Sequence, residues 1–434
     1  MIQKGTRAMV MRKREVDRRQ FLKQATLTGA GVLGFPCFVR SATLGKDGGV
    51  APSNRITVGC IGMGGRGTNN MRAFMGRKET QVIAVCDVHA DKRSRARRLV
   101  NEHYGNKNCD AYNDFRELVA REDIDVVSIA TPPHWHAIPS IEAAKSGKDV
   151  FCEKPLSLTI AEAQAMVNAV KRYERVFQTG SQQRSSWNFR FACELVRNGY
   201  IGELKTVTVN SGGAPRWCNL PPEPVPDYID WDLWLGQAPW RPFNKRLLAH
   251  QAWGYREYAG GGMAGCGSHD IDIAQWGMGM DDSGPVEIVS PDGKDYKRLT
   301  FRYANGVIMT NGPFKANGRA WIVLFTGTKG KVEVGRGHLR TWPETLKDVK
   351  IGNDEIHLYE SNDHKDNFLD SVRTRCRTIC DVEIGCHSVI VCHLGNIAYW
   401  LNRPLKWDPA REVFVGDDEA NRLLSRPMRS PWRL

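Results

Sequence analysis

The chain has 434 residues, 41% of them hydrophobic and 25% charged, and a formal net charge of +13. This length favours two domains, and 13 Trp, 15 Phe and 11 Tyr residues are enough to build a core, which excludes a disordered chain. No uninterrupted apolar stretch reaches the roughly 20 residues of a membrane span, which excludes a polytopic membrane protein.

The first 42 residues hold much of the excess positive charge. They contain nine basic and two acidic residues, and a weakly apolar stretch, Gln24–Val39, follows the basic block. This layout is typical of a signal peptide, and Arg18-Arg19-Gln20-Phe21-Leu22-Lys23 resembles the twin-arginine export signal. We therefore expect residues 1–42 to direct export to the periplasm or another extracytoplasmic space, with residues 43–54 as a linker. A basic amphipathic helix is the alternative, and the cleavage site stays open.

Without that segment the net charge falls from +13 to +6, and no basic stripe carries interleaved aromatic residues. We therefore predict no nucleic-acid partner and, after processing, no stable membrane span. The 12 Cys residues show no framework spacing, so buried free thiols are expected. Cys376, Cys380, Cys386 and Cys392 suggest a metal site, but no Cys-x-x-Cys pair is present, and we predict no metal.

A buried strand, Arg55–Ile61, is followed by a glycine-rich turn and an amphipathic segment. The turn, Gly62-Met63-Gly64-Gly65-Arg66-Gly67, has the G-x-G-x-x-G pattern in its required setting of strand, turn and helix. Gly62 permits the turn, Gly64 lets the backbone approach a pyrophosphate, and Gly67 lets helix and strand pack closely. The pattern predicts a dinucleotide site with the diphosphate at the helix N-terminus.

A second strand, Gln81–Cys86, ends in Asp87, 20 residues past Gly67. A carboxylate at this place binds the adenosine ribose hydroxyls and repels a 2′-phosphate. Asp87 therefore favours NAD over NADP as the cofactor. A helix-capping carboxylate without a ligand is the alternative.

Two further strands each end in a polar loop. Val126–Ala130 leads into Thr131-Pro132-Pro133-His134-Trp135-His136, and Asp149–Cys152 leads into Glu153-Lys154-Pro155. The β-α-β alternation predicts a doubly wound parallel sheet, a Rossmann domain, over residues 55–178. Ligands of such sheets bind at the carboxyl ends of the strands. The cofactor contacts expected there are Thr131, Pro132, His136, Glu153 and Lys154.

Together these features resemble the Gfo/Idh/MocA family, which includes glucose–fructose oxidoreductase and inositol dehydrogenase. The resemblance covers about residues 55–434 and rests on the segments described above. It continues through four later ones: Gly180-Ser181-Gln182-Gln183-Arg184, Gly202-Glu203-Leu204, Gly260-Gly261-Gly262-Met263, and Gly267-Ser268-His269 with Asp272.

The resemblance implies a C-terminal α/β domain, here residues 179–434, built on a large open and mostly antiparallel sheet. The outer face of that sheet often mediates dimers or tetramers, so a homodimer or homotetramer is expected. Segments 205–210, 298–303, 306–310 and 321–326 alternate as strands should. The Pro- and Trp-rich segment 221–240 is interpreted as a long ordered loop, either a lid or sugar-stacking surface or a packing or oligomer contact.

The resemblance also implies the catalytic residues. The Lys of Glu-Lys-Pro, Lys154, would hydrogen-bond the reacting hydroxyl, and His269 would supply acid–base chemistry. Substrate contacts are expected from four residues: Gln183, Arg184, Asp272 and His364. Hydride transfer from an alcohol carbon needs such a base and a donor to the developing alkoxide.

One position departs from the family pattern, because the Asp expected four residues before His269 is Gly265. A helix over 263–276 would put positions 265 and 269 on one face, so the orienting carboxylate is missing. Its replacement stays open among four residues: Tyr255, Glu257, Asp270 and Asp272.

The predicted function is an exported NAD(P)-dependent oxidoreductase that acts on a hydroxyl of a sugar, sugar derivative or cyclitol. A redox-neutral NAD-dependent glycosidase or lyase with a retained cofactor is the alternative, since free NAD is scarce outside the cytoplasm. A dinucleotide-binding protein without turnover is the third hypothesis.

Overall fold

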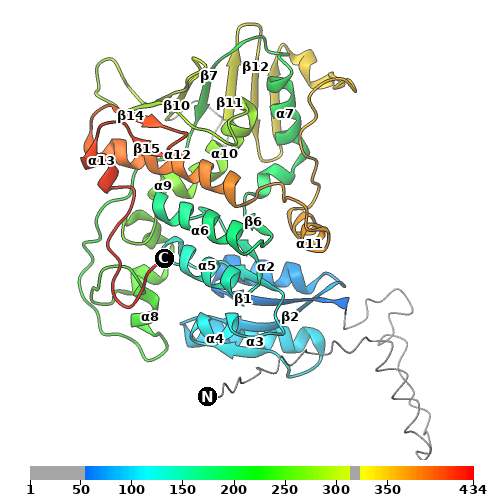
Figure 1. Ribbon diagram of the computed structural model, residues 1–434, viewed down its shortest axis with the longest axis vertical. Helices are drawn as coiled ribbons and strands as arrows, with labels where there is room; N and C mark the ends of the chain where they lie inside the picture. Colours follow the sequence, from blue (N-terminus) through cyan, green and yellow to red (C-terminus); the bar gives the residue numbers. More distant parts are fainter. Residues whose placement is uncertain (1–53, 313–322) are drawn as a thin grey trace, which may run out of the picture. The chain divides into compact units, whose positions relative to one another are not determined.

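Two β-sheets organise the residues described by the computed structural model, 54–312 and 323–434 (Figure 1). The predicted signal peptide, and the predicted linker apart from Asn54, lie outside the described residues. Residues Arg55–Leu434 form one unit.

The first sheet is parallel, and its strand order among the described residues is β3-β2-β1-β4-β5-β6. Its strands are β1 (Ile56–Ile61), β2 (Thr80–Cys86), β3 (Asp110–Tyr112), β4 (Val126–Ile129), β5 (Asp149–Cys152) and β6 (Phe177–Thr179). The apolar runs of β4 and β5 are buried throughout, as expected of strands covered on both faces. The predicted doubly wound parallel sheet is confirmed, and its order reverses between β1 and β4, where ligands of this fold bind.

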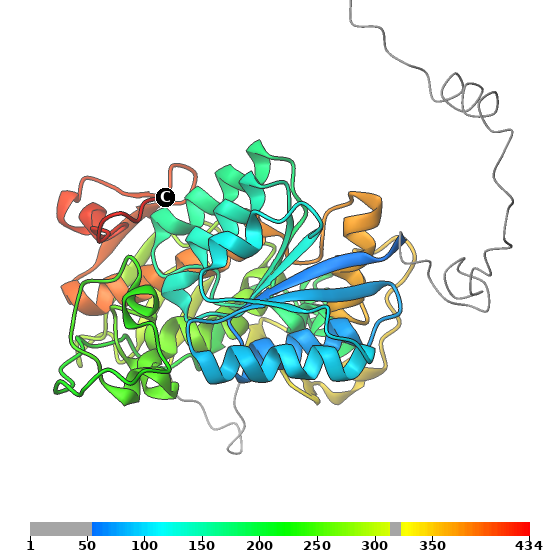
Figure 2. The same cartoon turned by 90° about the horizontal axis from the view of Figure 1, so that it is seen from below.

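Helices cover both faces of this sheet, as Figure 2 shows. One face packs against α2 (Gly65–Met75) and α3 (Ala90–Tyr104). The other packs against α4 (Phe115–Val119), α5 (Ala137–Lys145) and α6 (Ile160–Arg172). The first sheet is therefore covered by a hydrophobic core on both of its faces, as a parallel sheet needs.

The C-terminal half of the chain also contributes to this core. In α11 (His364–Thr374), Phe368 packs against Phe74 and Phe151, with ring centroids 6.5 and 5.7 Å apart. The boundary predicted at 178/179 falls inside β6. Side chains from both predicted domains thus pack together in one hydrophobic core.

The second sheet has the order β13-β12-β11-β7-β10-β9-β8-β14-β15 among the described residues. Its strands are β7 (Leu204–Val209), β8 (Glu287–Val289), β9 (Leu299–Arg302), β10 (Ile308–Asn311), β11 (Val323–Gly327), β12 (Lys331–Gly335), β13 (His338–Trp342), β14 (Leu405–Asp408) and β15 (Val413–Phe414). Its pairs are antiparallel except β7 with β10. The large, mostly antiparallel sheet is confirmed.

Three helices pack on this sheet: α7 (Trp187–Arg197), α10 (Gly267–Met278) and α12 (Val382–Leu401). Among the described residues, α12 alone is long and apolar enough to cross a membrane by length and composition, and 78% of its apolar window is buried. A helix that is apolar all round and lies inside the protein is typical of a core helix.

The segment between β7 and α9 (Gly261–Gly265), residues 210–260, is called the insert below. It contains α8 (Trp231–Leu235) and has a small core of its own, in which Trp231 stacks on Trp234 and meets Phe243 edge-on. The sequence predicted an ordered loop over 221–240, and the ordered region is longer.

Candidate active site

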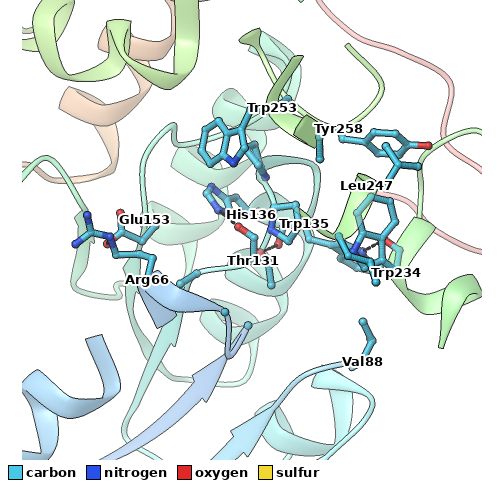
Figure 3. Close-up of a pocket in the computed structure, with 18 of the residues that line it drawn as sticks. Arg66, Val88, Thr131, Trp135, His136, Glu153, Trp234, Leu247, Trp253 and Tyr258 are labelled. Carbon is cyan, nitrogen blue, oxygen red and sulfur yellow. Dashed lines mark hydrogen bonds and ion pairs between the residues drawn. The ribbon is translucent and has the colours of Figure 1, made fainter. Parts of the chain in front are cut away.

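A cavity of about 1160 Å³ opens at the carboxyl ends of β1, β2, β4 and β5. The glycine-rich turn and the Glu153-Lys154 loop line one part of it, and the insert forms the opposite wall. In Figure 3, Arg66 and Glu153 lie at one end of the cavity, and Val88 and Trp234 lie at the other. The predicted cofactor loops therefore converge on one site.

The glycine-rich turn is shaped by two glycines that allow no side chain. Gly62 has φ +86°, and a Cβ there would lie 2.7 Å from the backbone of Ala130 and Thr131. A Cβ on Gly67 would lie 1.8 Å from the carbonyl oxygen of Gly62. Both residues are needed for the close approach of strand and helix.

The other two glycines face open space. A Cβ on Gly64 or Gly65 would meet no atom within 4 Å, and both residues line the cavity. Helix α2 begins at Gly65, and its N-cap, Gly64, has no side chain to satisfy the first amide groups. These open amides at a positive helix end fit a dinucleotide diphosphate.

Asp87, directly after β2, forms a hydrogen bond that holds the glycine-rich turn in place. Its Oδ2 accepts a hydrogen bond of 2.6 Å from the amide of Met63, and its Oδ1 accepts one of 2.8 Å from the amide of His89. The carboxylate lines the cavity, where Lys92 and Arg95 of α3 lie in the same lining. Its contact with an adenosine ribose stays a prediction.

His136 connects the loops after β4 and β5. Its Nδ1 lies 2.7 Å from the carbonyl oxygen of Pro155, and its Nε2 lies 2.9 Å from that of Thr131. Burial lowers the pKa of His136, so the neutral ring donates to one of these oxygens at a time. Thr131, Pro132 and His136 all line the cavity, as predicted for cofactor contacts.

Glu153 is held against the glycine-rich helix. Its Oε1 accepts a hydrogen bond of 3.0 Å from Asn70 of α2 and lies 3.7 Å from Nε of Arg66. These contacts occupy the carboxylate of a residue that also lines the cavity. Glu153 therefore fixes the loop that presents Lys154.

The side chain of Lys154 crosses to the second domain. Its Nζ donates a hydrogen bond of 2.8 Å to the carbonyl oxygen of Gly265 and lies 5.5 Å from the ring centroid of Trp253. Burial lowers the pKa of Lys154, and the positive charges of Arg66 and Arg336 contribute to this effect. A lysine amine in such surroundings exchanges a proton more readily than an exposed one.

The helix considered over 263–276 is interrupted at Cys266, which separates α9 from α10. The glycine-rich sequence around the break has low helix propensity. The break exposes the carbonyl of Gly265 to Lys154. A Cβ at position 265 would lie 3.1 Å from the ring of Trp253, so this indole occupies the space of a side chain there.

His269 and Asp270 lie in the first turns of α10, behind the cavity wall. His269 is 2% exposed, and its Nδ1 has no hydrogen-bond partner among the described residues. Burial and the charge of Lys154 lower the pKa of His269 well below its usual range, so the imidazole is neutral. Asp270 is fully buried with neither oxygen bonded in the described chain, and burial raises its pKa.

Tyr255 and Glu257 are two further candidates to replace the carboxylate missing at position 265, and they lie in different places. Tyr255 lines the cavity. Glu257 instead accepts hydrogen bonds of 2.9 and 3.1 Å from the amide of Cys218. The catalytic role of His269 stays a prediction.

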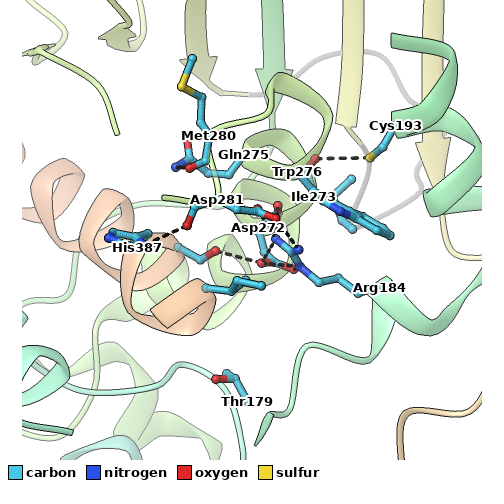
Figure 4. Close-up of polar contacts among 12 residues, drawn as sticks. Thr179, Arg184, Cys193, Asp272, Ile273, Gln275, Trp276, Met280, Asp281 and His387 are labelled. Atoms are coloured by element: carbon cyan, nitrogen blue, oxygen red, sulfur yellow. Dashed lines mark hydrogen bonds and ion pairs between the residues drawn. The ribbon is translucent and has the colours of Figure 1, made fainter. Parts of the chain in front are cut away.

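Arg184 and Asp272 form a buried ion pair (Figure 4). Arg184 Nε donates to both oxygens of Asp272 at 3.0 and 2.9 Å, and its Nη2 lies 2.7 Å from Asp281 Oδ1. Both side chains of the pair are 1% exposed, and neither residue lines the cavity. The two charges thus pair with each other inside the protein, and a contact of either residue with a substrate stays a prediction.

His364 and Gln183 also lie outside the cavity lining. His364 Nε2 lies 2.9 Å from the carbonyl of Thr179, and its Nδ1 lies 2.9 Å from Oγ of Ser185. Burial lowers the pKa of His364 to about 4. His364 thus packs at the start of α11, Gln183 is buried, and neither lines the cavity; their contacts with a substrate stay predictions.

Four aromatic residues form one wall of the cavity; of these, only Trp234 lies in the segment 221–240 for which a lid or sugar-stacking surface was one interpretation. Trp135 comes from the loop after β4, whereas Trp234, Trp253 and Tyr258 come from the insert. The Trp-rich composition of the insert was visible in the sequence. The sequence did not show that the insert contacts a cofactor site formed by residues that come about 100 positions earlier, as Trp135 does relative to Trp234.

Two family models match the chain. The model described as "Oxidoreductase family, NAD-binding Rossmann fold" covers residues 56–181, and "Oxidoreductase family, C-terminal alpha/beta domain" covers residues 193–434. The chain belongs to the Gfo/Idh/MocA oxidoreductase family. This Gfo/Idh/MocA protein therefore carries the NAD-binding domain that the glycine-rich turn predicted.

Curated relatives match part of the chain. A "Glycosyl hydrolase family 109 protein 1" of Shewanella sp. (strain MR-4) is 32% identical over 203 residues, 44% of each chain. An "Alpha-N-acetylgalactosaminidase" of Shewanella oneidensis is 30% identical over 203 residues, again 44% of each chain. The matches thus span less than half of these relatives.

Solved structures share the fold. The WlbA dehydrogenase of Bordetella pertussis, in complex with NADH and UDP-GlcNAcA, has a TM-score of 0.58 at 18% identity and covers 82% of this chain and 99% of its own. Scyllo-inositol dehydrogenase of Lactobacillus casei has a TM-score of 0.57 at 17% identity and covers 81% and 99%. At these identities the likeness shows the fold alone.

Proposed function

We propose that this protein is an NAD-dependent oxidoreductase that acts on a hydroxyl group of a sugar, a sugar derivative or a cyclitol. One observation carries the proposal: Lys154, half-buried and with a pKa lowered by desolvation, lines the same cavity as the glycine-rich turn. The cavity thus combines a binding site for a dinucleotide with an amine, that of Lys154, which can exchange a proton with a hydroxyl.

NAD, when bound, supplies the hydride acceptor. The open amides at Gly64 and Gly65 hold its diphosphate, and Asp87 binds the ribose hydroxyls and favours NAD over NADP. The amine of Lys154 takes the proton of the substrate hydroxyl and, as an ammonium group, returns it to the oxygen in the reverse direction. Neutral His269 is the second candidate for proton exchange.

The names of similar proteins support a carbohydrate substrate. Scyllo-inositol dehydrogenase acts on a cyclitol, and the WlbA structure contains the nucleotide sugar UDP-GlcNAcA. Trp253 lines the cavity beside Lys154, with its ring centroid 5.5 Å from Nζ, and offers an apolar face on which a sugar ring can stack.

A redox-neutral glycosidase or lyase is the second candidate. The relatives named glycosyl hydrolase family 109 and alpha-N-acetylgalactosaminidase favour it. In this scheme a hydroxyl would be oxidised transiently and the aglycone would leave by elimination; in a glycosidase water would then add to the resulting double bond, and the hydride would return to the sugar carbon. Lys154 would exchange the same hydroxyl proton in both schemes.

One assay separates the two candidates. Purified protein is incubated with NAD and a panel of free sugars and cyclitols and, separately, with aryl glycosides. NADH formation from a free sugar supports the oxidoreductase. Aglycone release without net NADH supports the glycosidase, and neither signal from protein that binds NAD would favour binding without turnover.

We also propose that the protein is exported by the twin-arginine route and forms a homodimer or homotetramer. The motif Arg18-Arg19-Gln20-Phe21-Leu22-Lys23 supports export. Replacement of Arg18 and Arg19 by Lys should retain the protein in the cytoplasm, as fractionation would detect. Light scattering on the purified protein tests the oligomer, and a monomer would contradict it.

A further inference from the structure

Three side chains stack on one another beside the candidate active site. The Cζ atom of Arg256 lies 4.0 Å from the ring centroid of Trp217 and 3.9 Å from that of Trp400. Trp217 and Arg256 belong to the insert, whereas Trp400 lies in α12. The guanidinium group is therefore sandwiched between two indoles, and the three residues are called the aromatic stack below.

The two indoles of the aromatic stack differ in exposure. Trp400 is half-buried and packs against the hydrophobic core, and its Nε1 donates to the carbonyl of Pro215 at 3.3 Å. Trp217 is 63% exposed, although one side of its ring rests on Arg256. A cation–π contact at an exposed site is weak, so covering Arg256 is a small gain for an exposed indole. The aromatic stack therefore presents a large apolar ring to solvent.

Hydrogen bonds fix the backbone on both sides of Trp217. The amide of Arg216 donates to the carbonyl of Gly254 at 3.0 Å, and the amide of Cys218 donates to both carboxylate oxygens of Glu257 at 2.9 and 3.1 Å. The exposed ring is thus held in place before a ligand arrives, which lowers the entropy cost of binding against it.

The aromatic stack adjoins the cavity. Arg216 and Tyr255 form a parallel bridge, and both line the cavity. Their neighbours Trp217 and Arg256 lie outside the lining, as expected because successive residues of an extended chain face opposite sides. Arg216 is also exposed, so the cavity opens to solvent next to the aromatic stack.

A short path leads from the proposed reaction centre to the aromatic stack. Trp253, labelled in Figure 3, has its ring centroid 5.5 Å from Nζ of Lys154. Gly254 follows it in the chain and accepts the hydrogen bond of Arg216, which precedes Trp217. Consecutive residues are about 3.8 Å apart, so an oligosaccharide can reach from Lys154 to the aromatic stack.

We propose that the aromatic stack is a carbohydrate subsite, and that the substrate is an oligosaccharide with one sugar unit beside Lys154 and a further unit packed on Trp217. The inference rests on the proposed function. The C–H groups on one face of a sugar ring pack on an indole, and the N–H groups of Arg256 at the edge of the stack can donate to sugar hydroxyls. Binding of the remote unit then positions the reacting unit.

The test measures binding rather than turnover, so failure of the proposed reaction leaves its result valid. Isothermal titration calorimetry on NAD-loaded protein compares the mono-, di- and trisaccharides of glucose, galactose, mannose and their N-acetylated amino sugars. Trp217→Ala removes the exposed ring of the aromatic stack. Trp187→Ala is the matched control, because Trp187 is 55% exposed and stacks on Phe191, outside the cavity lining.

We expect at least one di- or trisaccharide to bind roughly tenfold or more tightly than the corresponding monosaccharide. Trp217→Ala should remove this difference, and Trp187→Ala should retain it. The proposal is overturned if no di- or trisaccharide binds, if all lengths bind equally, or if the preference for the longer sugar survives Trp217→Ala. Light scattering tests the other occupant: a lower oligomeric mass of Trp217→Ala would assign the ring to a contact between copies of this chain and overturn the subsite.

Discussion

Lys154 Nζ donates a hydrogen bond of 2.8 Å to the carbonyl oxygen of Gly265, 111 residues later in the chain. Position 265 therefore contacts the lysine through its backbone, although it lacks the carboxylate that the family pattern led us to expect. The ring of Trp253 occupies the space where a side chain at 265 would project.

Gly265→Asp tests this arrangement. A Cβ at 265 would lie 3.1 Å from the indole, so we expect the substitution to displace Trp253, disturb Lys154 and lower turnover rather than raise it. Gly213→Ala is the control, because a Cβ there meets no atom within 4 Å. Steady-state kinetics of both variants decide the point, and higher activity of Gly265→Asp would contradict the account.

Lys154→Met should lower turnover by roughly 100-fold or more, because it removes the proton-exchanging group. Cofactor binding should persist, since the glycine-rich turn is built from other residues. Fluorescence titration with NADH and turnover on the same preparation give both quantities. A variant that retains full turnover would exclude Lys154 from the reaction.

The pH dependence of turnover should report Lys154. Burial disfavours its ammonium form and lowers its pKa, so the amine appears at a lower pH than in an exposed lysine. Alcohol oxidation uses the amine, and its rate should therefore rise with pH through this lowered pKa and then level off. Lys154→Arg, whose guanidinium stays charged, should lack that rise. A flat profile in the unmodified protein would contradict the assignment.

Asp272→Asn leaves the charge of buried Arg184 without its main partner and should lower the free energy of unfolding by about 3–5 kcal/mol. Glu287→Gln is the control, because its pair with Arg302 is partly exposed and contributes at most about 1 kcal/mol. Denaturant unfolding measures both. A variant as stable as the control would show that this pair does not support the domain.

Two glycines of one turn should respond differently to alanine. Gly67→Ala places a Cβ 1.8 Å from the carbonyl of Gly62 and should destabilise the fold. Gly65→Ala meets no protein atom, so the fold should persist while NAD affinity falls, because the methyl group enters the space left for the diphosphate. Thermal unfolding and NADH titration separate the effects. If Gly65→Ala binds NAD as tightly as the unmodified protein, the proposal that the diphosphate lies against Gly65 is contradicted.

Local patterns were sufficient for the Rossmann half. The strand, glycine turn and Asp87 follow one another in sequence, and their geometry is dictated by neighbouring residues. The interruption at Cys266 and the bond from Lys154 to the carbonyl of Gly265 were not predicted, because that bond is a tertiary contact between residues 111 positions apart.

The surroundings of the predicted substrate residues could not be predicted from local sequence either. Arg184 and Asp272 are polar residues in segments that match the family, and nothing local shows that they pair with each other. The insert was recognisable by its Trp and Pro content, yet its position over the cavity depends on bonds to residues 88–135. Such contacts between distant segments are not encoded in a local pattern.

The most direct test of the proposed function is a single-turnover measurement with NAD-loaded protein and a panel of sugars and cyclitols. NADH fluorescence detects reduction even when the cofactor does not leave the protein. We expect a rise with at least one sugar or cyclitol in the unmodified protein and none in Lys154→Met. No rise with any compound, or an equal rise in Lys154→Met, would contradict the central claim that Lys154 and NAD together oxidise a carbohydrate hydroxyl.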